Sequence, residues 1–204
     1  HAWGIEPCRM EDIKSYRPAD KSICEGQVLS CPYPYEKARL IVQEMTESLA
    51  FRLSDLKMIT DSLTLTVGYD RANCTTGSYQ GEIHIDHYGR SVPKAAHGTI
   101  HLDPPTNLGS RLIDAAVRLY AQITSPQLLV RRISIAANRV IEDHGIYQLN
   151  LFTDMKKLER EKKLQETMLD IKKRFGKNSV LKGTSFLDGA TMRERNGQIG
   201  GHKA

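Results

Sequence analysis

The strongest pattern in this sequence is a strict alternation of apolar and small polar residues over residues 62–69. A period of two predicts a β-strand whose two faces meet different surroundings. One face is suited to a core, and the other is small and polar. The apolar set is Leu63, Leu65, Val67 and Tyr69, and the polar set is Ser62, Thr64, Thr66 and Gly68.

Three further segments have strand-like patterns. Residues 21–29 are expected to form a first strand with an irregularity at Gly26, and residues 98–102 another, which Pro104 ends. The last strand covers residues 129–140 and also alternates. Its apolar positions are Ile133, Ile135 and Ala137, and its other face carries Arg132, Ser134, Ala136 and Asn138.

Two segments between these strands have the periodicity of amphipathic helices. The first covers residues 35–56, with Glu44 and Glu47 away from its apolar side. The second can be capped by Asn107 or Ser110 and ends near Ile123. The apolar positions are Ile41, Met45, Leu49, Leu53 and Leu56 in the first helix, and Leu112, Ala115, Ala116, Leu119 and Ala121 in the second.

The order strand, helix, strand, strand, helix, strand predicts an α+β fold. With right-handed crossovers, this βαββαβ order closes as a four-stranded antiparallel sheet with both helices on one face. The other face is then open, and small hydroxyls beside arginines suit contact with phosphates. An ordinary solvated sheet face also carries alternate polar residues, so both interpretations stay open. The expected open face contains Thr64, Thr66, Thr99, His101, Arg132, Ser134 and Asn138.

A short peptide, Gln148-Leu149-Asn150-Leu151-Phe152, follows the last strand. A polar anchor, two leucines one residue apart and an aromatic side chain can fill pockets on a partner while the backbone binds a groove. The alternative is a fifth strand or a helix start, with Leu149 and Leu151 in this chain's own core.

The remaining segments are less regular. Residues 1–20 are expected to be the end of one element and a linker, and residues 70–96 a long polar insertion containing the alternating piece 83–85. A charged helix over residues 154–175 should stop at Gly176 and dock by one short apolar stripe. Residues 177–204 are expected to be loosely ordered. The stripe consists of Leu164, Met168, Ile171 and Phe175.

Charge is unevenly placed along the chain. Residues 1–153 hold 16 Lys and Arg against 17 Asp and Glu, whereas residues 154–204 hold 13 against 7. If residues 1–153 bind nucleic acid, their positive charges must therefore be concentrated on one face. No long apolar run or secretory signal is present, and a start without methionine suggests a fragment.

Cysteine and histidine spacing argues against disulfides and metal binding. The four cysteines form no Cys-x-x-Cys pair, which fits a reducing cytosol. The histidines of residues 84–101 lack a supporting cysteine or carboxylate pattern. They are His84, His87, His97 and His101.

Several stretches resemble the Y-family, or translesion, DNA polymerases, in particular the UmuC and UvrX-like (ImpB/MucB/SamB) branch. Residues 1–6 resemble the end of its thumb domain, and residues 21–23 the entry to its little finger, or polymerase-associated, domain. Residues 88–94 and 96–99 resemble the branch's insertion and third strand. Residues 148–152 are similar to the sliding-clamp-binding motif of bacterial polymerases, and residues 193–204 to the ending of the branch.

The resemblance implies a division of the chain and a fold. Residues 1–20 would be the thumb end and linker, residues 21–146 the little finger, residues 147–153 the clamp-binding peptide, and residues 154–204 a basic helix and flexible tail. The little finger of this family has the βαββαβ fold that periodicity also predicts.

The resemblance also implies DNA binding. The open sheet of a little finger lies against the major groove of primer-template duplex DNA and contacts its backbone. Arg131 and Arg132 point to opposite faces of a regular strand, and the alternation favours Arg132 for the contact. The expected DNA-binding residues are Lys21, Ser22, Thr64, Thr66, Arg90, Lys94, Thr99, Arg131, Arg132 and Ser134.

The expected clamp partner is the DNA polymerase III beta subunit, bound by Gln148, Leu149, Asn150, Leu151 and Phe152. A recombinase or another repair protein is a further candidate partner, and no membrane is implied. The setting would be bacterial DNA damage tolerance and the SOS response, in the cytoplasm at the nucleoid.

Catalysis is not expected of this chain. The palm carboxylates that hold two Mg²⁺ ions in this family lie upstream of the thumb, so no catalytic residue, metal ligand or cofactor is assigned here. Two alternatives remain. One is an RNA-recognition-like module, although Thr99 and His101 occupy positions where such modules have aromatic residues. The other is a protein-interaction module.

Overall fold

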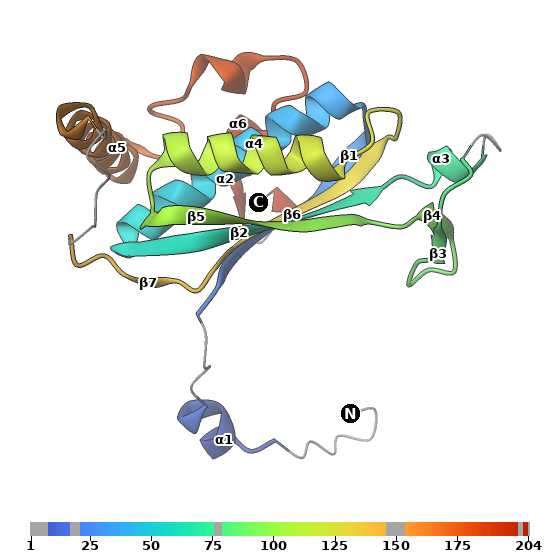
Figure 1. Cartoon of the computed structure of the whole chain (residues 1–204), viewed down its shortest axis with the longest axis horizontal. Coiled ribbons are helices and arrows are strands. Elements are labelled where there is room, and N and C mark those ends of the chain that lie inside the picture. The colour runs from blue at the N-terminus through green and yellow to red at the C-terminus, as the bar shows by residue number, and fades with distance from the viewer. Residues whose placement is uncertain (1–7, 17–20, 76–78, 146–153, 200–201, 204) are drawn as a thin grey trace.

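The computed structural model describes residues 8–16, 21–75, 79–145, 154–199 and 202–203. Four antiparallel strands form the main sheet in the order β1-β6-β2-β5 (Figure 1). They are β1 (Ile23–Tyr33), β2 (Met58–Tyr69), β5 (Ala96–Thr106) and β6 (Val130–Asn138), and the short β7 (Ile141–Glu142) pairs with the start of β2.

Helices α2 (Tyr35–Asp55) and α4 (Gly109–Ile123) lie together on one face of this sheet (Figure 1). The predicted βαββαβ architecture is therefore confirmed. Strand β5 runs further than predicted, through Pro104 and Pro105 to Thr106. Proline lacks an N–H donor, and β5 can accommodate it because it lies at the edge of the main sheet.

The core lies between the sheet and these two helices. The alternating apolar residues of β2 and β6 meet the apolar sides of α2 and α4, and the alternation therefore assigned the covered face correctly. The fully or almost fully buried members are Ile41, Met45, Leu49, Leu53, Leu63, Leu65, Val67, Leu112, Ala115, Ala116, Leu119, Ile133, Ile135 and Ala137.

Two predicted core positions are wrong. Leu56 is 53% exposed because α2 ends at Asp55 and Leu56 is already its C-cap. Ala121 is exposed because it is about 180° around the helix from Leu112, at 100° per residue. The buried position next to it belongs to Tyr120, whose hydroxyl donates a hydrogen bond to the carbonyl of Tyr35 at 3.0 Å.

Two further expectations, that Glu44 and Glu47 lie away from the packed side of α2 and that the C-terminal segment is loosely ordered, are corrected for the described residues. Glu44 and Glu47 of α2 are buried, and residues of the segment 177–199 contact both of them. Glu44 Oε2 accepts hydrogen bonds from the backbone N–H of Thr191 at 2.8 Å and of Met192 at 3.1 Å. Glu47 forms an ion pair with Lys182 at 3.0 Å. This segment contains η1 (Gly183–Phe186), α6 (Met192–Arg195) and β8 (Gln198–Ile199), which pairs with β9 (His202–Lys203).

Helix α5 (Met155–Phe175) is capped by Gly176, as predicted, but only the middle of the expected stripe, Met168 and Ile171, is half-buried. Leu164 is 59% exposed and Phe175 74%. A polar residue, Gln165, adds hydrogen bonds to this contact. Gln165 Oε1 accepts from the N–H of Gly109 at 2.8 Å, and its Nε2 donates to the carbonyl of Asn107 at 2.9 Å.

This contact also replaces the predicted helix cap. The N-cap of α4 is Leu108, and no side chain of its own caps the helix. The amide of Asn107 donates to the carbonyl of Met58 at 3.0 Å, and Ser110 donates to Glu161 of α5 at 2.9 Å. A glutamine 56 residues away thus satisfies one of the free N–H groups of α4.

Gly98 is required where α4 crosses β5. A Cβ at this position would lie 2.8 Å from Cγ2 of Ile123 and 3.1 Å from Cδ1 of Leu119. We expect Gly98→Ala to lower the free energy of unfolding by about 1–3 kcal/mol, because the β-branched Ile123 cannot move without shifting α4. Urea denaturation followed by circular dichroism measures this change.

Gly26→Ala is the matched control for this prediction. Gly26 is also in a strand, but a Cβ there would have no neighbour within 4 Å. We expect this variant to be neutral or to gain up to about 1 kcal/mol, because alanine restricts the unfolded chain. Equal losses in the two variants would contradict the close approach of α4 at Gly98.

Candidate nucleic-acid interface

The face of the sheet opposite α2 and α4 is uncovered in the described part of the chain (Figure 1). Strand register decides which residues share this face, because directly opposed residues of paired strands point to the same side. Thr64 of β2 is opposite Thr99 and Ala136, and Thr66 is opposite Ser134. The predicted hydroxyl residues are therefore adjacent.

The polar side chains of this face form hydrogen bonds with one another. The hydroxyls of Thr64 and Thr99 lie 2.8 Å apart, and the amide of Asn138 donates to Thr64 Oγ1 at 2.8 Å. Thr66 Oγ1 is 2.9 Å from Nδ1 of His97. These short side chains form a low, polar surface across β5, β2 and β6 whose hydroxyls can turn toward an acceptor outside the protein.

The two neighbouring arginines of β6 have different surroundings. Gly68 is opposite Arg132 and Tyr69 is opposite Val130, so the ladder skips Arg131 at a bulge. Arg132 is exposed on the open face, as the alternation favoured. Arg131 is half-buried, and its Nε lies 3.8 Å from Asp70.

Sequence reasoning missed another cation at this surface. Arg139 follows β6 with a φ of 46°, so it leaves the strand alternation on which the prediction depended. Its guanidinium donates to Asp61 at 2.9 Å and lies 3.2 Å from Nδ1 of His101. Lys21 and Ser22 are exposed. They lie close to Arg139, because the carbonyl of Lys21 accepts a hydrogen bond from the N–H of Val140 at 2.9 Å.

Arg90 and Lys94 lie on a hairpin that joins β3 (Ile83–Ile85) to β4 (Ser91–Pro93). Each already has a carboxylate partner. Arg90 Nε donates to Asp86 at 2.7 Å, and Lys94 donates to Glu82 at 2.8 Å. These hydrogen bonds lower the pKa of both carboxyls, which therefore stay ionised at neutral pH. A phosphate would have to share or displace them.

The ten predicted DNA-binding residues thus fall into separate groups. Thr64, Thr66, Thr99, Arg132 and Ser134 share the open face. Lys21 and Ser22 lie just before β1, Arg131 lies in the bulge, and Arg90 and Lys94 lie on the hairpin. Contact of any of them with DNA remains a prediction.

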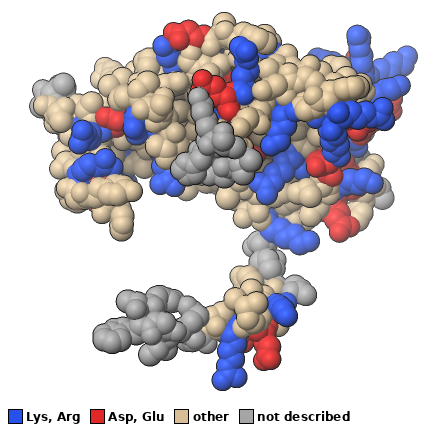
Figure 2. Space-filling view, turned by 180° about the vertical axis from the view of Figure 1, so that it is seen from behind, with Lys and Arg blue, Asp and Glu red and all other residues tan. Residues whose placement is uncertain are grey.

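Among the described elements, helix α5 carries the strongest accumulation of positive charge. This helix carries eight Lys and Arg against four Asp and Glu. Figure 2 shows lysine and arginine side chains gathered at the end of the molecule where α5 lies. Helix α5 packs beside the helix layer, so this charge is separate from the open face (Figure 1).

The predicted clamp-binding peptide, Gln148 to Phe152, lies outside the described residues. The described segments before and after this peptide contact each other through an ion pair. Asp143, after β7, pairs with Lys162 of α5 at 3.2 Å. The N-cap of α5 is Asp154, whose carboxylate accepts from the N–H of Lys157 at 3.1 Å.

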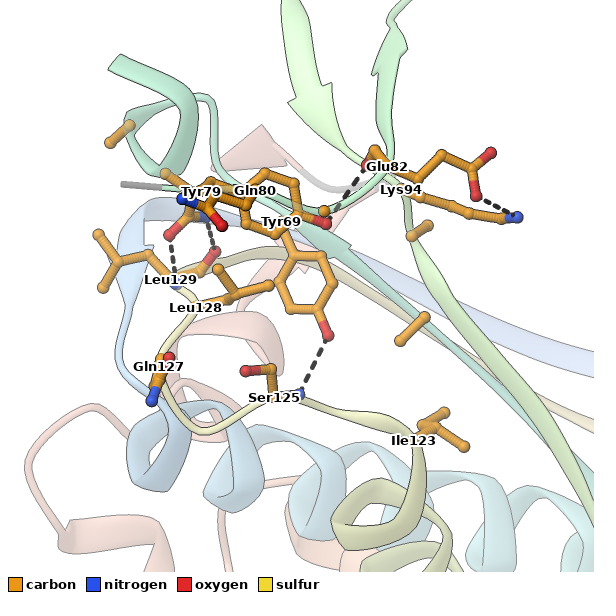
Figure 3. A pocket seen from close by; sticks show the side chains of 15 residues that line it. Tyr69, Tyr79, Gln80, Glu82, Lys94, Ile123, Ser125, Gln127, Leu128 and Leu129 are labelled. Atoms are coloured by element: carbon orange, nitrogen blue, oxygen red, sulfur yellow. Dashed lines mark hydrogen bonds and ion pairs between the residues drawn. The ribbon is translucent and has the colours of Figure 1, made fainter. Parts of the chain in front are cut away.

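A cleft of about 720 Å³ lies between the insertion and the loop before β6 (Figure 3). The hydroxyl of Tyr69 accepts from the N–H of Ser125 at 3.3 Å, and that of Tyr79 donates to the carbonyl of Glu82 at 3.3 Å. The charged residues of its lining, Glu82 and Lys94, pair with each other. The other described residues of this lining are uncharged.

Neither a metal-binding cluster nor a membrane-spanning helix is found among the described residues. No three His, Cys, Asp or Glu side chains there are grouped so that they could hold a metal ion. No described helix combines the length and the hydropathy that crossing a bilayer requires.

Three comparisons relate the chain to known proteins. Residues 20–151, about two thirds of the chain, match the impB/mucB/samB family C-terminal domain. UvrX of Bacillus subtilis (strain 168), named as a UV-damage repair protein, is 23% identical over 184 residues. That alignment covers 90% of this chain but 39% of UvrX, so the chain spans well under half of this relative.

A solved complex of the beta-clamp processivity factor and the little finger domain of PolIV aligns with 65% of this chain and 100% of the solved chain, with a TM-score of 0.40 and 11% identity. The family match covers the whole four-stranded sheet with its two helices. This protein therefore belongs to the impB/mucB/samB family, and residues 20–151 are its C-terminal domain.

Proposed function

We propose that this chain is the DNA-binding and clamp-docking part of a translesion DNA polymerase whose catalytic palm lies outside it. The observation that carries the proposal is the open sheet face of a family C-terminal domain, where the half-buried hydroxyls of Thr64, Thr66 and Ser134 lie beside the exposed Thr99 and Arg132. UvrX, the relative named for UV-damage repair, is consistent with a role in damage tolerance.

The chemistry of the open face suits a sugar-phosphate backbone. Threonine and serine hydroxyls donate hydrogen bonds to phosphate oxygens, and Arg132 supplies charge. Such contacts carry little sequence information, which fits an enzyme that follows any template. The short side chains of Thr64, Thr66 and Thr99 also allow a close approach to the DNA.

The clamp peptide would supply what this face lacks. The region before α5 has nearly balanced charge, so its grip on DNA should be weak at physiological salt. Binding of Gln148 to Phe152 to a sliding clamp that encircles DNA raises the local concentration of the domain at the primer terminus. The peptide gives attachment, and the sheet gives alignment.

The RNA-binding alternative has no support from the described part of the open face. Base stacking in RNA-recognition modules uses aromatic residues on central strands. The outward residues of the central strands β2 and β6 are threonine, serine, alanine, glycine, asparagine and Arg132. Thr99 and His101 of β5 likewise offer no phenyl or phenol ring.

Fluorescence anisotropy with a labelled blunt duplex tests the DNA-binding proposal. We expect weak binding whose logarithm falls linearly with the logarithm of salt concentration, by about 0.9 for each phosphate neutralised. Arg132→Gln should reduce that slope by about 0.9 and weaken binding, because it removes one exposed cation from the open face.

Arg118→Gln is the matched control. Arg118 is an exposed arginine of α4, on the helix side of the sheet, and pairs with Asp114 at 3.2 Å. Its removal should leave both affinity and salt slope unchanged. No binding at low salt, binding that salt does not affect, or equal losses in the two variants would contradict the proposal.

A further inference from the structure

The β3–β4 hairpin exposes an unusual amount of apolar and aromatic surface along β3 and at its tip. Tyr88 is 77% exposed, Ile85 67% and Ile83 49%. The Arg90 guanidinium carbon lies 4.8 Å from the centre of the Tyr88 ring, and the His87 ring is inclined at 73° to it with the two ring centres 5.5 Å apart. The ring of Tyr88 thus has two side-chain neighbours, Arg90 and His87, yet most of its surface remains accessible.

The backbone of the tip is held by Asp86. Its Oδ1 accepts hydrogen bonds from the N–H groups of Tyr88 and Arg90, each at 2.9 Å. Its own N–H donates to the carbonyl of Arg90 at 2.9 Å. Gly89 adopts a φ of 74°, a conformation that favours glycine. The aromatic ring is therefore presented on a preorganised turn, which reduces the entropy lost when a ligand binds.

Electrostatics make the tip a poor phosphate site. The Arg90 side chain is paired with Asp86, and Lys94 is paired with Glu82. These four residues are the charged groups of residues 82–94 apart from histidine, and their charges cancel. What the tip offers is a flat aromatic ring backed by a guanidinium, which suits a planar and weakly charged group.

The hairpin lies where a nucleic acid on the open face would pass. In Figure 1 it hangs from one end of the main sheet toward the side away from α2 and α4. Strand β4 leads directly into β5, which carries Thr99 of the open face. A duplex contacting the open face along the strands would therefore reach the hairpin at one end.

We propose that Tyr88, backed by Arg90, stacks on an unpaired nucleobase where duplex DNA on the open face gives way to single strand. Bases in a duplex are stacked on their neighbours, so only an unpaired base has a free face for the ring. Aromatic stacking tolerates any base, since every base has a π-face. The inference rests on the proposed binding of DNA by the open face and adds to it a site that distinguishes a junction from a blunt duplex.

The test compares two DNA molecules that share one duplex, one blunt and one with a single-stranded 5′ overhang carrying 2-aminopurine next to the junction. The chain should bind the overhang molecule about 5- to 150-fold more tightly than the blunt one, the range expected for stacking of one base. Binding should also change the 2-aminopurine fluorescence. Tyr88→Ala should abolish both effects, whereas Tyr88→Phe should retain them, because stacking uses the ring.

Phe186→Ala is the matched control. Phe186 is also an exposed aromatic residue, 63% accessible, with the Arg193 guanidinium 4.9 Å from its ring centre. It lies in the C-terminal segment, which packs against α2 and not on the open face. Its removal should leave the junction preference unchanged.

The two proposals fail separately. Blunt-duplex binding without a junction preference, or a preference that Tyr88→Ala leaves intact, would overturn the stacking site while the DNA-binding proposal stands. Absence of binding to either DNA would instead overturn the DNA-binding proposal. Circular dichroism of Tyr88→Ala should match that of the unsubstituted chain, because the side chain is 77% exposed.

Discussion

Alanine at both Leu151 and Phe152 should lower the affinity of this chain for the sliding clamp by more than about 100-fold. An apolar anchor that fills a partner's pocket contributes about 2 kcal/mol or more, and two such losses exceed this factor. Surface plasmon resonance with immobilised beta clamp measures the change. Both residues lie outside the described part of the structure, so the expectation derives from the peptide pattern and the proposed function.

Leu164→Ala controls for the loss of an exposed leucine. Leu164 is 59% exposed on α5, 12 residues beyond Phe152, and its replacement should leave clamp binding unchanged. Clamp binding by the double variant at the level of the unsubstituted chain would exclude the peptide as the anchor. A loss of clamp binding accompanied by a fall in thermal stability would favour the alternative, in which Leu149 and Leu151 belong to this chain's own core.

Glutamates at Thr66 and Ser134 should reduce binding to duplex DNA by more than about 30-fold at low salt. These residues are directly opposed on β2 and β6, at the middle of the open face. Two negative charges there would face phosphates, and juxtaposed like charges cost several kcal/mol. Fluorescence anisotropy should show this loss, and the difference from the unsubstituted chain should shrink as salt screens the repulsion.

The control must change the net charge by the same amount. Arg118→Glu on α4 shifts the charge of the chain by two units, as the two glutamates together do, but on the helix side of the sheet. It should retain most of the DNA affinity. Opposed glutamates also repel within the sheet, so urea denaturation should establish that the double variant is folded. Similar losses in both variants would mean that DNA responds to net charge alone and that the open face is not the contact.

The strand and helix patterns were sufficient to predict the architecture. Alternation in β2 placed Leu63, Leu65 and Val67 in the core and Thr64 and Thr66 on the open face, and the structure agrees. Alternation in β6 likewise distinguished Arg132 from Arg131. Periodicity succeeds in these elements because it records which side of a strand or helix must avoid water, and that requirement is local.

The sequence could not predict which distant segment covers an element. Glu44 appeared to be solvated because nothing near it in sequence marks a burial site, yet Thr191 and Met192 donate to it from 147 residues away or more. Nothing in the sequence around Gln165 indicates that its side chain accepts a hydrogen bond from the free N–H of Gly109 at the N-terminus of α4. Polar contacts of this kind have no periodicity, so no window along the chain contains them.

The features of the candidate site also divide into those that the sequence determined and those that only the tertiary structure decided. The sequence by itself determined that the chain has a sheet with one apolar and one hydroxyl-rich face, since burial of apolar area requires that segregation. Only the tertiary structure decided what accompanies the hydroxyl face: Arg139 beside Asp61, the carboxylate partners of Arg90 and Lys94, and the support of the Tyr88 ring. Those features depend on backbone turns and side-chain distances, which residue order alone leaves open until the strands have paired.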